Sequence, residues 1–134
     1  MDKISVVINT LNEENDLPRA IGSVKDLADE IVVVDMESSD RTVEIAKKLG
    51  AKVYSHKKEK CVEIVRNFLI SKATGDWVLV LDPDVEIGLG LSKSLKKIRE
   101  KPEADYYRLA RKNIIFGKWI KHSRWWPDYN IRFF

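Results

Sequence analysis

Residues 30–55 read EIVVVDMESSDRTVEIAKKLGAKVYS, and the fold class can be inferred from them. Residues 31–34 are continuously apolar, as expected of a parallel strand that is covered on both faces. A polar turn then opens a helix predicted over residues 41–49, whose apolar side chains recur at helical spacing and which Gly50 ends. Residues 52–55 carry the signal of a second, shorter strand. The stretch therefore predicts a strand, a crossover helix and a parallel strand.

The same alternation of strand and helix runs along most of the chain. Short apolar runs predict strands, and apolar residues at helical spacing predict helices. Further strands are expected at residues 4–8, 77–81 and 106–110, and further helices at residues 17–27, 59–73 and 89–101. We therefore expect an α/β fold with a mostly parallel, Rossmann-like sheet and helices on both faces, formed by one domain over residues 1–134.

Composition sets few limits on function. Hydrophobic residues make up 44% of the chain and charged residues 34%, which is ordinary for a globular protein. The apolar runs are too short to cross a bilayer, and no secretory signal is visible, so a cytoplasmic location is the expectation. Basic residues outnumber acids after Asp105, and this tail could face phosphates, anionic lipid or nucleic acid, or simply be solvated.

Polar clusters follow three of the predicted strands. They are residues 9–14 (NTLNEE), 35–40 (DMESSD) and 82–84 (DPD). In open α/β sheets ligands bind beyond the carboxyl ends of the strands, so these clusters are expected to meet at one edge. Acids gathered there would repel one another, which predicts a cation or a donor-rich ligand. A lone acid such as Asp40 is more often a helix cap or turn residue, and only the three clusters together favour a ligand site.

Asp82-Pro83-Asp84 is the most informative cluster, because it directly follows an apolar strand. Two carboxylates one residue apart can point into the same space, one toward a metal and the other toward a hydroxyl of the ligand. Diphosphate oxygens would complete the coordination of a hard divalent cation bound there. It would neutralise the charge that develops on a departing nucleoside diphosphate.

Several stretches resemble the family 2 glycosyltransferases with a GT-A fold. They are residues 4–14 (ISVVINTLNEE), 30–45 (EIVVVDMESSDRTVEI), 66–67 (RN) and 73–84 (ATGDWVLVLDPD). Residues 125–134 (WWPDYNIRFF) are similar to the bacterial subgroup that includes lipopolysaccharide core glucosyltransferases. The resemblance spans nearly the whole chain and is specific for the family, but not for a substrate. It implies a DXD metal motif at residues 82–84 and a role in cell envelope polysaccharide biosynthesis.

The resemblance also implies a role for each matching residue. Those that would contact the nucleotide sugar are Thr10, Asn12, Glu13, Asp35, Arg66 and Asp82. Asp35 would accept a hydrogen bond from the base, Arg66 would lie near the base and diphosphate, and Asp82 would approach the ribose. Asp84 would coordinate manganese or magnesium. Without the resemblance, Arg66 would be interpreted as a charge on a helix surface.

The inverting transfer implied by the resemblance needs a base that takes the proton from the acceptor hydroxyl. Asp128 is the only acid beyond Asp105 and lies among Trp125, Trp126 and Tyr129 in the sequence. We predict that Asp128 is this base. A structural role, in which Asp128 holds an arginine or caps a turn, is an equal alternative.

Two residues depart from the family pattern. Glu37 stands where the family usually has Gly, which permits backbone conformations and close approach that Glu does not. Pro83 stands where a small residue is usual, which stiffens the metal loop and keeps both carboxylates. Family members commonly continue further, so the chain could be truncated, with residues 113–134 as the acceptor-side segment.

The sequence thus predicts a metal-dependent glycosyltransferase that moves a sugar from a UDP- or GDP-sugar to a glycan or lipid-linked acceptor. One alternative is a catalytically incomplete module of the same fold that binds a nucleotide sugar or a partner. Another is a phosphoacceptor receiver domain, which needs an acidic pair where this chain has Asn9-Thr10. Peripheral membrane contact and a homodimer docked through Phe133 and Phe134 are further expectations. Nucleic-acid binding is disfavoured, because no recognisable module accompanies the basic tail.

Overall fold

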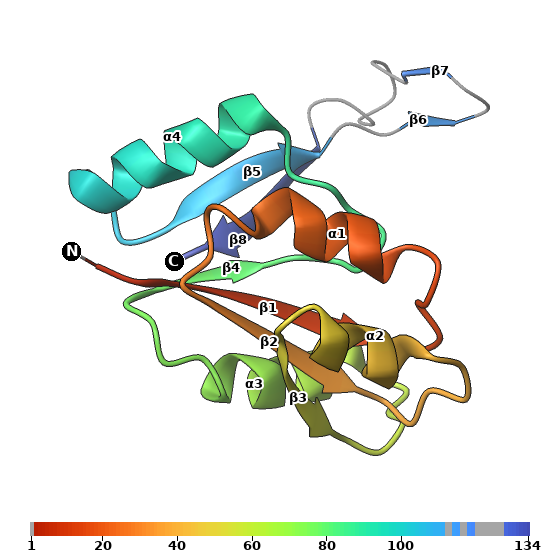
Figure 1. The fold of residues 1–134 in the computed structure, drawn as a ribbon. Helices are drawn as coiled ribbons and strands as arrows, with labels where there is room; N and C mark the ends of the chain where they lie inside the picture. The colour runs from red at the N-terminus through yellow and green to blue at the C-terminus, as the bar shows by residue number, and fades with distance from the viewer. Residues whose placement is uncertain (1, 112–113, 116–117, 120–127) are drawn as a thin grey trace.

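The computed structural model describes residues 2–111, 114–115, 118–119 and 128–134, which include a six-stranded sheet in the order β3-β2-β1-β4-β8-β5 (Figure 1). The strands of this sheet are β1 (Ile4–Thr10), β2 (Glu30–Asp35), β3 (Lys52–Ser55), β4 (Trp77–Val80), β5 (Tyr107–Arg111) and β8 (Asp128–Phe133). The described helices are α1 (Leu17–Val24), α2 (Thr42–Lys48), α3 (Val62–Ser71) and α4 (Leu89–Glu100). The short strands β6 (Ile114–Ile115) and β7 (Lys118–Trp119) pair with each other.

The four strands β1 to β4 form the parallel part of the sheet. β1 pairs with β2 on one side and with β4 on the other, and β2 pairs with β3. β8 is antiparallel to both β4 and β5 and lies between them. The mostly parallel α/β sheet predicted from the pattern of strands and helices is therefore confirmed.

Side chains that alternate along the parallel strands build a core on each face of the sheet. Val6 and Leu79 belong to the core that also contains buried residues of α1, α2 and α4. Val7 and Val80 belong to the core on the opposite face, which contains buried residues of α3. Helices therefore cover both faces, as the continuously apolar strands predict.

All four predicted helices are shorter in the structure, two of them by three or more residues. The helix predicted to residue 27 ends at Val24, because the chain turns there and the N–H groups of Leu27 and Ala28 both donate to the Val24 carbonyl oxygen. Leu27 is still buried, so the apolar pattern identified a core residue that a turn places. The helix predicted from residue 59 begins only after Cys61, whose backbone is extended.

At the amino-terminal edge of the parallel strands, hydrogen bonds to Glu30 connect β2 with β1, with β3 and with the segment before β4. Its carboxylate accepts from Ser5 Oγ at 2.5 Å, from Lys52 Nζ at 3.0 Å, and from the backbone N–H and Oγ1 of Thr74 at 3.0 and 2.9 Å. Burial alone would raise the pKa of Glu30, but these donors lower it to about 2. Gly75 packs against β1 so closely that a Cβ at this position would lie 2.9 Å from the backbone N of Ser5, which leaves no room for a side chain.

Candidate functional site

The opposite, carboxyl-terminal edge of the parallel strands brings acids from three loops together. Burial raises the pKa of the Glu13 carboxyl, and the negative charges of Asp16, Asp84 and Asp40 raise it further. Glu13 and Asp16 follow β1, Asp40 follows β2 and Asp84 follows β4. We call these four residues the acidic mouth. Its carboxylates share one region of negative potential, which favours a cation.

Thr10 and Asp35, which were predicted to line the base site, bind each other. Thr10 Oγ1 donates to Asp35 Oδ1 at 2.7 Å, and Asp35 also accepts from the backbone N–H and Oγ of Ser38 at 2.9 and 2.6 Å. Thr10 is fully buried and Asp35 is 3% exposed. These bonds join the ends of β1 and β2 and fix the loop that follows β2. Ser38 was not among the predicted site residues.

Asn12 ties the same two loops together. Its backbone N–H donates to Ser38 Oγ at 2.8 Å, and its Oδ1 accepts from the backbone N–H groups of Ser39 at 2.8 Å and Asp40 at 3.4 Å. Asn12 has φ 55° and Glu37 has φ 57°, both in the left-handed region that glycine adopts most readily. Position 37 therefore has a backbone suited to Gly, with a Glu side chain on it.

Asp40 and Thr42 hold the backbone of the first loop. The N–H of Glu13 donates to Thr42 Oγ1 at 2.9 Å, Thr42 Oγ1 in turn donates to Asp40, and the N–H of Glu14 donates to Asp40 Oδ2 at 3.2 Å. The Thr42 hydroxyl is the main cause of a lowered pKa at Asp40. Asp40 also accepts from the backbone N–H of Thr42, the first residue of α2, so it is a turn residue one position before the N-cap residue, Arg41.

The two acids after β4 have different surroundings. Asp82 is partly buried, and its Oδ2 accepts a hydrogen bond from Arg132 Nη2 at 3.3 Å. Asp84 is exposed and makes no ion pair with a described residue. Asp84 is therefore the carboxylate that is more available to a cation.

A metal held entirely by protein side chains does not fit this edge. Within the described ranges, no group of three or more His, Cys, Asp or Glu side chains could hold a metal ion. Magnesium and similar hard cations are commonly bound through one or two carboxylates and completed by phosphate oxygens and water. The exposed Asp84 beside Glu13 fits that kind of site.

Arg66 and Asp128 both come from elements that reach this edge. α3 starts after the carboxyl end of β3, and Arg66, in its first half, is half-buried with no partner for Nε among the described residues. β8 runs antiparallel to β4, so its first residue, Asp128, begins at the same edge and pairs through its backbone with Arg111. The side chain of Asp128 lies outside the described residues.

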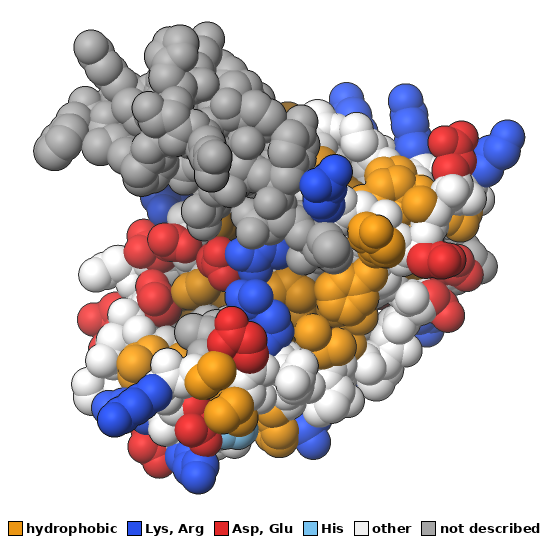
Figure 2. All heavy atoms as spheres, turned by 180° about the vertical axis from the view of Figure 1, so that it is seen from behind, with side chains coloured by type: hydrophobic (Ala, Val, Ile, Leu, Met, Phe, Trp, Pro, Cys, Tyr) orange, Lys and Arg blue, Asp and Glu red, His pale blue; other side chains and the backbone are white. Residues whose placement is uncertain are grey.

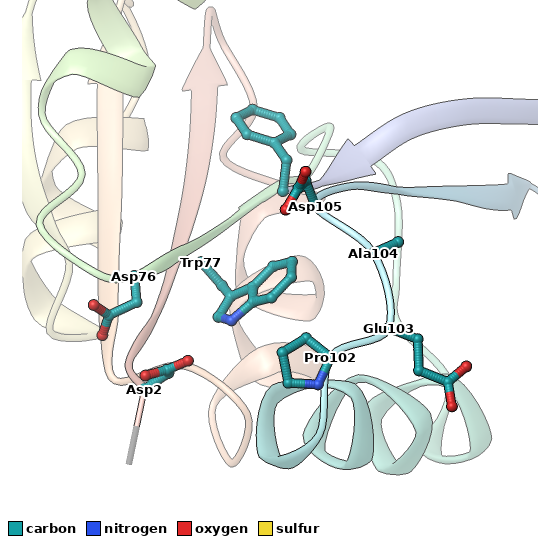
Figure 3. Close-up of a pocket in the computed structure, with 8 residues that line it drawn as sticks. Asp2, Asp76, Trp77, Pro102, Glu103, Ala104 and Asp105 are labelled. Atoms are coloured by element: carbon teal, nitrogen blue, oxygen red, sulfur yellow. The ribbon is translucent and has the colours of Figure 1, made fainter.

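A hollow lies at the amino-terminal edge. It is a groove of about 580 Å³ whose lining includes Trp77, Pro102 and Phe134. Acids also line it, namely Asp2, Asp76, Glu103 and Asp105. Figure 3 shows the Trp77 ring lying between the start of β4 and Pro102 at the end of α4. Open α/β sheets bind ligands at the other edge, so we do not assign the predicted site to this groove.

Residues 5–134 match the sequence model of the family described as glycosyl transferase family 2. The chain belongs to this family. An uncharacterized glycosyltransferase of Rickettsia typhi is 44% identical to it over 131 residues, which cover 97% of the chain and 44% of that protein. A TPR repeat-containing protein of Synechococcus elongatus is 37% identical over 124 residues, covering 92% of the chain and 30% of that protein. The chain thus spans less than half the length of these curated relatives.

Solved structures share the architecture of this family 2 domain. The crystal structure of S. aureus TarS 1-349 has a TM-score of 0.74 and 26% identity, covering 90% of this chain and 39% of that chain. Glucosyl-3-phosphoglycerate synthase from Mycobacterium tuberculosis, in complex with Mn²⁺, UDP and glucosyl-3-phosphoglycerate, has a TM-score of 0.53 and 29% identity. That match covers 63% of this chain and 36% of the synthase. The predicted family and the GT-A fold are confirmed, whereas the lipopolysaccharide core subgroup stays a prediction.

Proposed function

We propose that this family 2 domain moves a sugar from a nucleoside diphosphate donor to a glycan or lipid-linked acceptor, with a divalent cation at Asp84. The observation that carries the proposal is the meeting of acids from three strand ends, where the charges of Asp16, Asp40 and Asp84 act on Glu13. Such a mouth favours a cation that already carries phosphate oxygens. The M. tuberculosis synthase, crystallised with Mn²⁺ and UDP-glucose, supports this choice of ligands.

Manganese or magnesium is the cation we propose. When bound, it would neutralise the charge that forms on the departing nucleoside diphosphate. Asp84 would hold it directly, and the negative charge of Glu13 would add to the attraction. Asp82 would approach the ribose, in the orientation that its contact with Arg132 gives it.

We assign the base and ribose pocket to the loops after β1 and β2. Their shared hydrogen bonds, from Thr10 to Asp35 and from Ser39 to Asn12, give that pocket a fixed shape before a ligand binds. Asp35 would offer its remaining acceptor capacity to the base. Arg66, whose Nε has no described partner, would donate to the base or diphosphate side of the ligand.

Asp128 is the proposed base of an inverting transfer. Its place at the start of β8 puts it at the edge where the proposed donor site lies. From there it would take the proton of the acceptor hydroxyl as the sugar is transferred.

Location and partners rest on the sequence. No helix in the described part of the chain is both long and apolar enough to cross a membrane. Phe133 is fully buried in the core, so the expectation that it docks a second copy is wrong. The cytoplasmic location, the peripheral membrane contact, the homodimer itself and the role in cell envelope synthesis stay predictions.

Turnover of a nucleotide-sugar donor tests the proposal and its main alternative. With manganese, we expect hydrolysis of or transfer from one donor of a UDP- and GDP-sugar panel, lost in Asp84→Ala and retained in the control Asp105→Ala at the opposite edge. Donor binding without turnover would instead support a catalytically incomplete module. Equal turnover in wild type and Asp84→Ala would contradict the metal assignment.

A further inference from the structure

Arg132 reaches the predicted site from a strand that the sequence pattern did not reveal. Phe133 packs into the core that contains α1, α2 and α4, so its neighbour Arg132 points to the α3 face. Leu81 belongs to the same core as Phe133, and Asp82 follows it just beyond the end of β4. β8 is the neighbour of β4, which brings the two side chains into contact.

The contact with Asp82 uses only part of the Arg132 guanidinium. Nη2 donates to Asp82 Oδ2 at 3.3 Å, and the two side chains are 18% and 26% exposed. Nη1 is buried and has no hydrogen-bond partner among the described residues. A buried donor without an acceptor is costly, and phosphate oxygens match the planar fork of a guanidinium well.

Arg99 provides a comparison, because it too has a buried guanidinium nitrogen without a described hydrogen-bond partner. It pairs with Asp29 at 3.5 Å, is 13% exposed and also has a buried Nε without a described partner. Asp29 precedes β2 and so lies at the amino-terminal edge, away from the acidic mouth. A buried nitrogen without a partner therefore does not by itself indicate a ligand. Arg132 differs from Arg99 because it contacts Asp82, a predicted site residue.

The α3 face offers a suitable setting for an anion beside Asp82. Figure 2, seen from behind, shows basic side chains gathered in the middle of the molecule, next to acidic side chains and an apolar area. Arg66 on α3 also has a buried guanidinium nitrogen without a described partner. Positive charge thus accompanies the acids at this side of the site.

We propose that Arg132 bridges Asp82 and the diphosphate of the bound donor. Nη2 holds the Asp82 carboxylate in the orientation in which it meets the ribose, while Nη1 donates to a diphosphate oxygen. The bridge offsets the charge of Asp82, which leaves Asp84 as the carboxylate of residues 82–84 that faces the cation. This inference rests on the proposed nucleotide-sugar site and adds a residue to it.

Calorimetric titration tests the bridge directly. Wild type, Arg132→Gln, Arg132→Lys and the matched control Arg99→Gln are titrated with UDP and GDP in the presence of manganese. The corresponding nucleosides are titrated by NMR. Both Arg132 variants should bind the nucleoside diphosphate about tenfold or more weakly, because a charge-assisted hydrogen bond is lost. Nucleoside binding should not change, and Arg99→Gln should bind both ligands like wild type.

Two results would overturn the inference in different ways. If wild type binds neither nucleoside diphosphate, the proposed function itself fails. If wild type binds one and the Arg132 variants bind it within about twofold of wild type, the contact with Asp82 is only structural. Arg132→Lys keeps a positive charge beside Asp82 and decides the question if Arg132→Gln does not fold.

Discussion

The partly buried acids at the two edges of the parallel sheet have pKa values that are shifted in opposite directions. At the amino-terminal edge, Glu30 receives hydrogen bonds from Ser5, Thr74 and Lys52, and its pKa falls to about 2. At the carboxyl-terminal edge, Glu13 is partly buried near other acids and its pKa is raised. Within the described residues, no donor binds the Glu13 carboxylate.

This contrast separates acids that stabilise the fold from acids whose charge is balanced only when a ligand binds. A carboxylate with internal donors contributes stability by itself. A carboxylate that faces other carboxylates costs stability until a cation or donor arrives from outside. The site is therefore assigned to the edge whose charges remain unbalanced.

The largest expected effect concerns Asp128 at the start of β8. Asp128→Asn should lower the rate of sugar transfer by a factor of about 10²–10⁴, because the acceptor hydroxyl would lose its base. Nucleotide binding should be unchanged. Steady-state transfer kinetics and nucleotide titration check both parts, with Asp105→Asn as the control at the opposite edge. Transfer that stays largely intact would eliminate Asp128 as the base.

Glu30→Gln should lower the free energy of unfolding by about 1–3 kcal/mol at pH 7, because Ser5, Thr74 and Lys52 lose a charged acceptor. The pKa of Glu30 is lower in the folded state, so its contribution is fully present above about pH 4.5. It disappears as the pH falls toward about 2. Urea unfolding at several pH values measures this, with the exposed Glu100→Gln as control. A difference from wild type that does not shrink at acid pH would refute the assigned cause.

Glu37→Gly should raise the free energy of unfolding by about 0.5–1 kcal/mol, because Gly adopts the positive φ of this position without steric cost. Thermal and urea unfolding measure the gain. Glu44→Gly, in α2, provides the control and should lose about 1 kcal/mol. Destabilisation by Glu37→Gly would show that the Glu side chain makes a contact that outweighs the backbone cost.

The smallest expected effect is at Glu13. Glu13→Gln should raise the free energy of unfolding by less than about 1 kcal/mol at pH 7, because one negative charge leaves the acidic mouth. The folded-state pKa of Glu13 is raised, so the charge costs stability as the pH rises above about 4.5, and the gain should vanish in acid. Manganese should reduce the difference in the free energy of unfolding between wild type and Glu13→Gln. A gain that is independent of pH would point to another cause.

Much of the parallel sheet could be predicted from the sequence. The apolar runs of β1, β2 and β4 are continuous because both faces of these strands are buried, and β3 has the bounds predicted from its pattern. Parallel strands share the direction in which they end, so the gathering of Glu13, Asp40 and Asp84 could be expected as well.

The contribution of β8 could not be read from local patterns. Its place between β4 and β5 depends on pairing with strands that are distant in sequence, and residues 128–134 follow a Trp-rich segment without a clear alternation. Arg132 was therefore seen only as part of the basic tail and of the resembling segment at residues 125–134. The bonds that bury Asp35 were also hidden, because they depend on how the loop through Ser38 folds back.

Thermal unfolding with nucleotides shows whether a cation at Asp84 is needed to bind a nucleoside diphosphate. The protein is heated with UDP, GDP, CDP or TDP, each with and without manganese, and Asp84→Ala is treated in the same way. We expect that one nucleotide raises the unfolding temperature of wild type only when manganese is present, and that Asp84→Ala loses this response. A wild-type protein that no combination stabilises, or a shift that needs neither manganese nor Asp84, would contradict it.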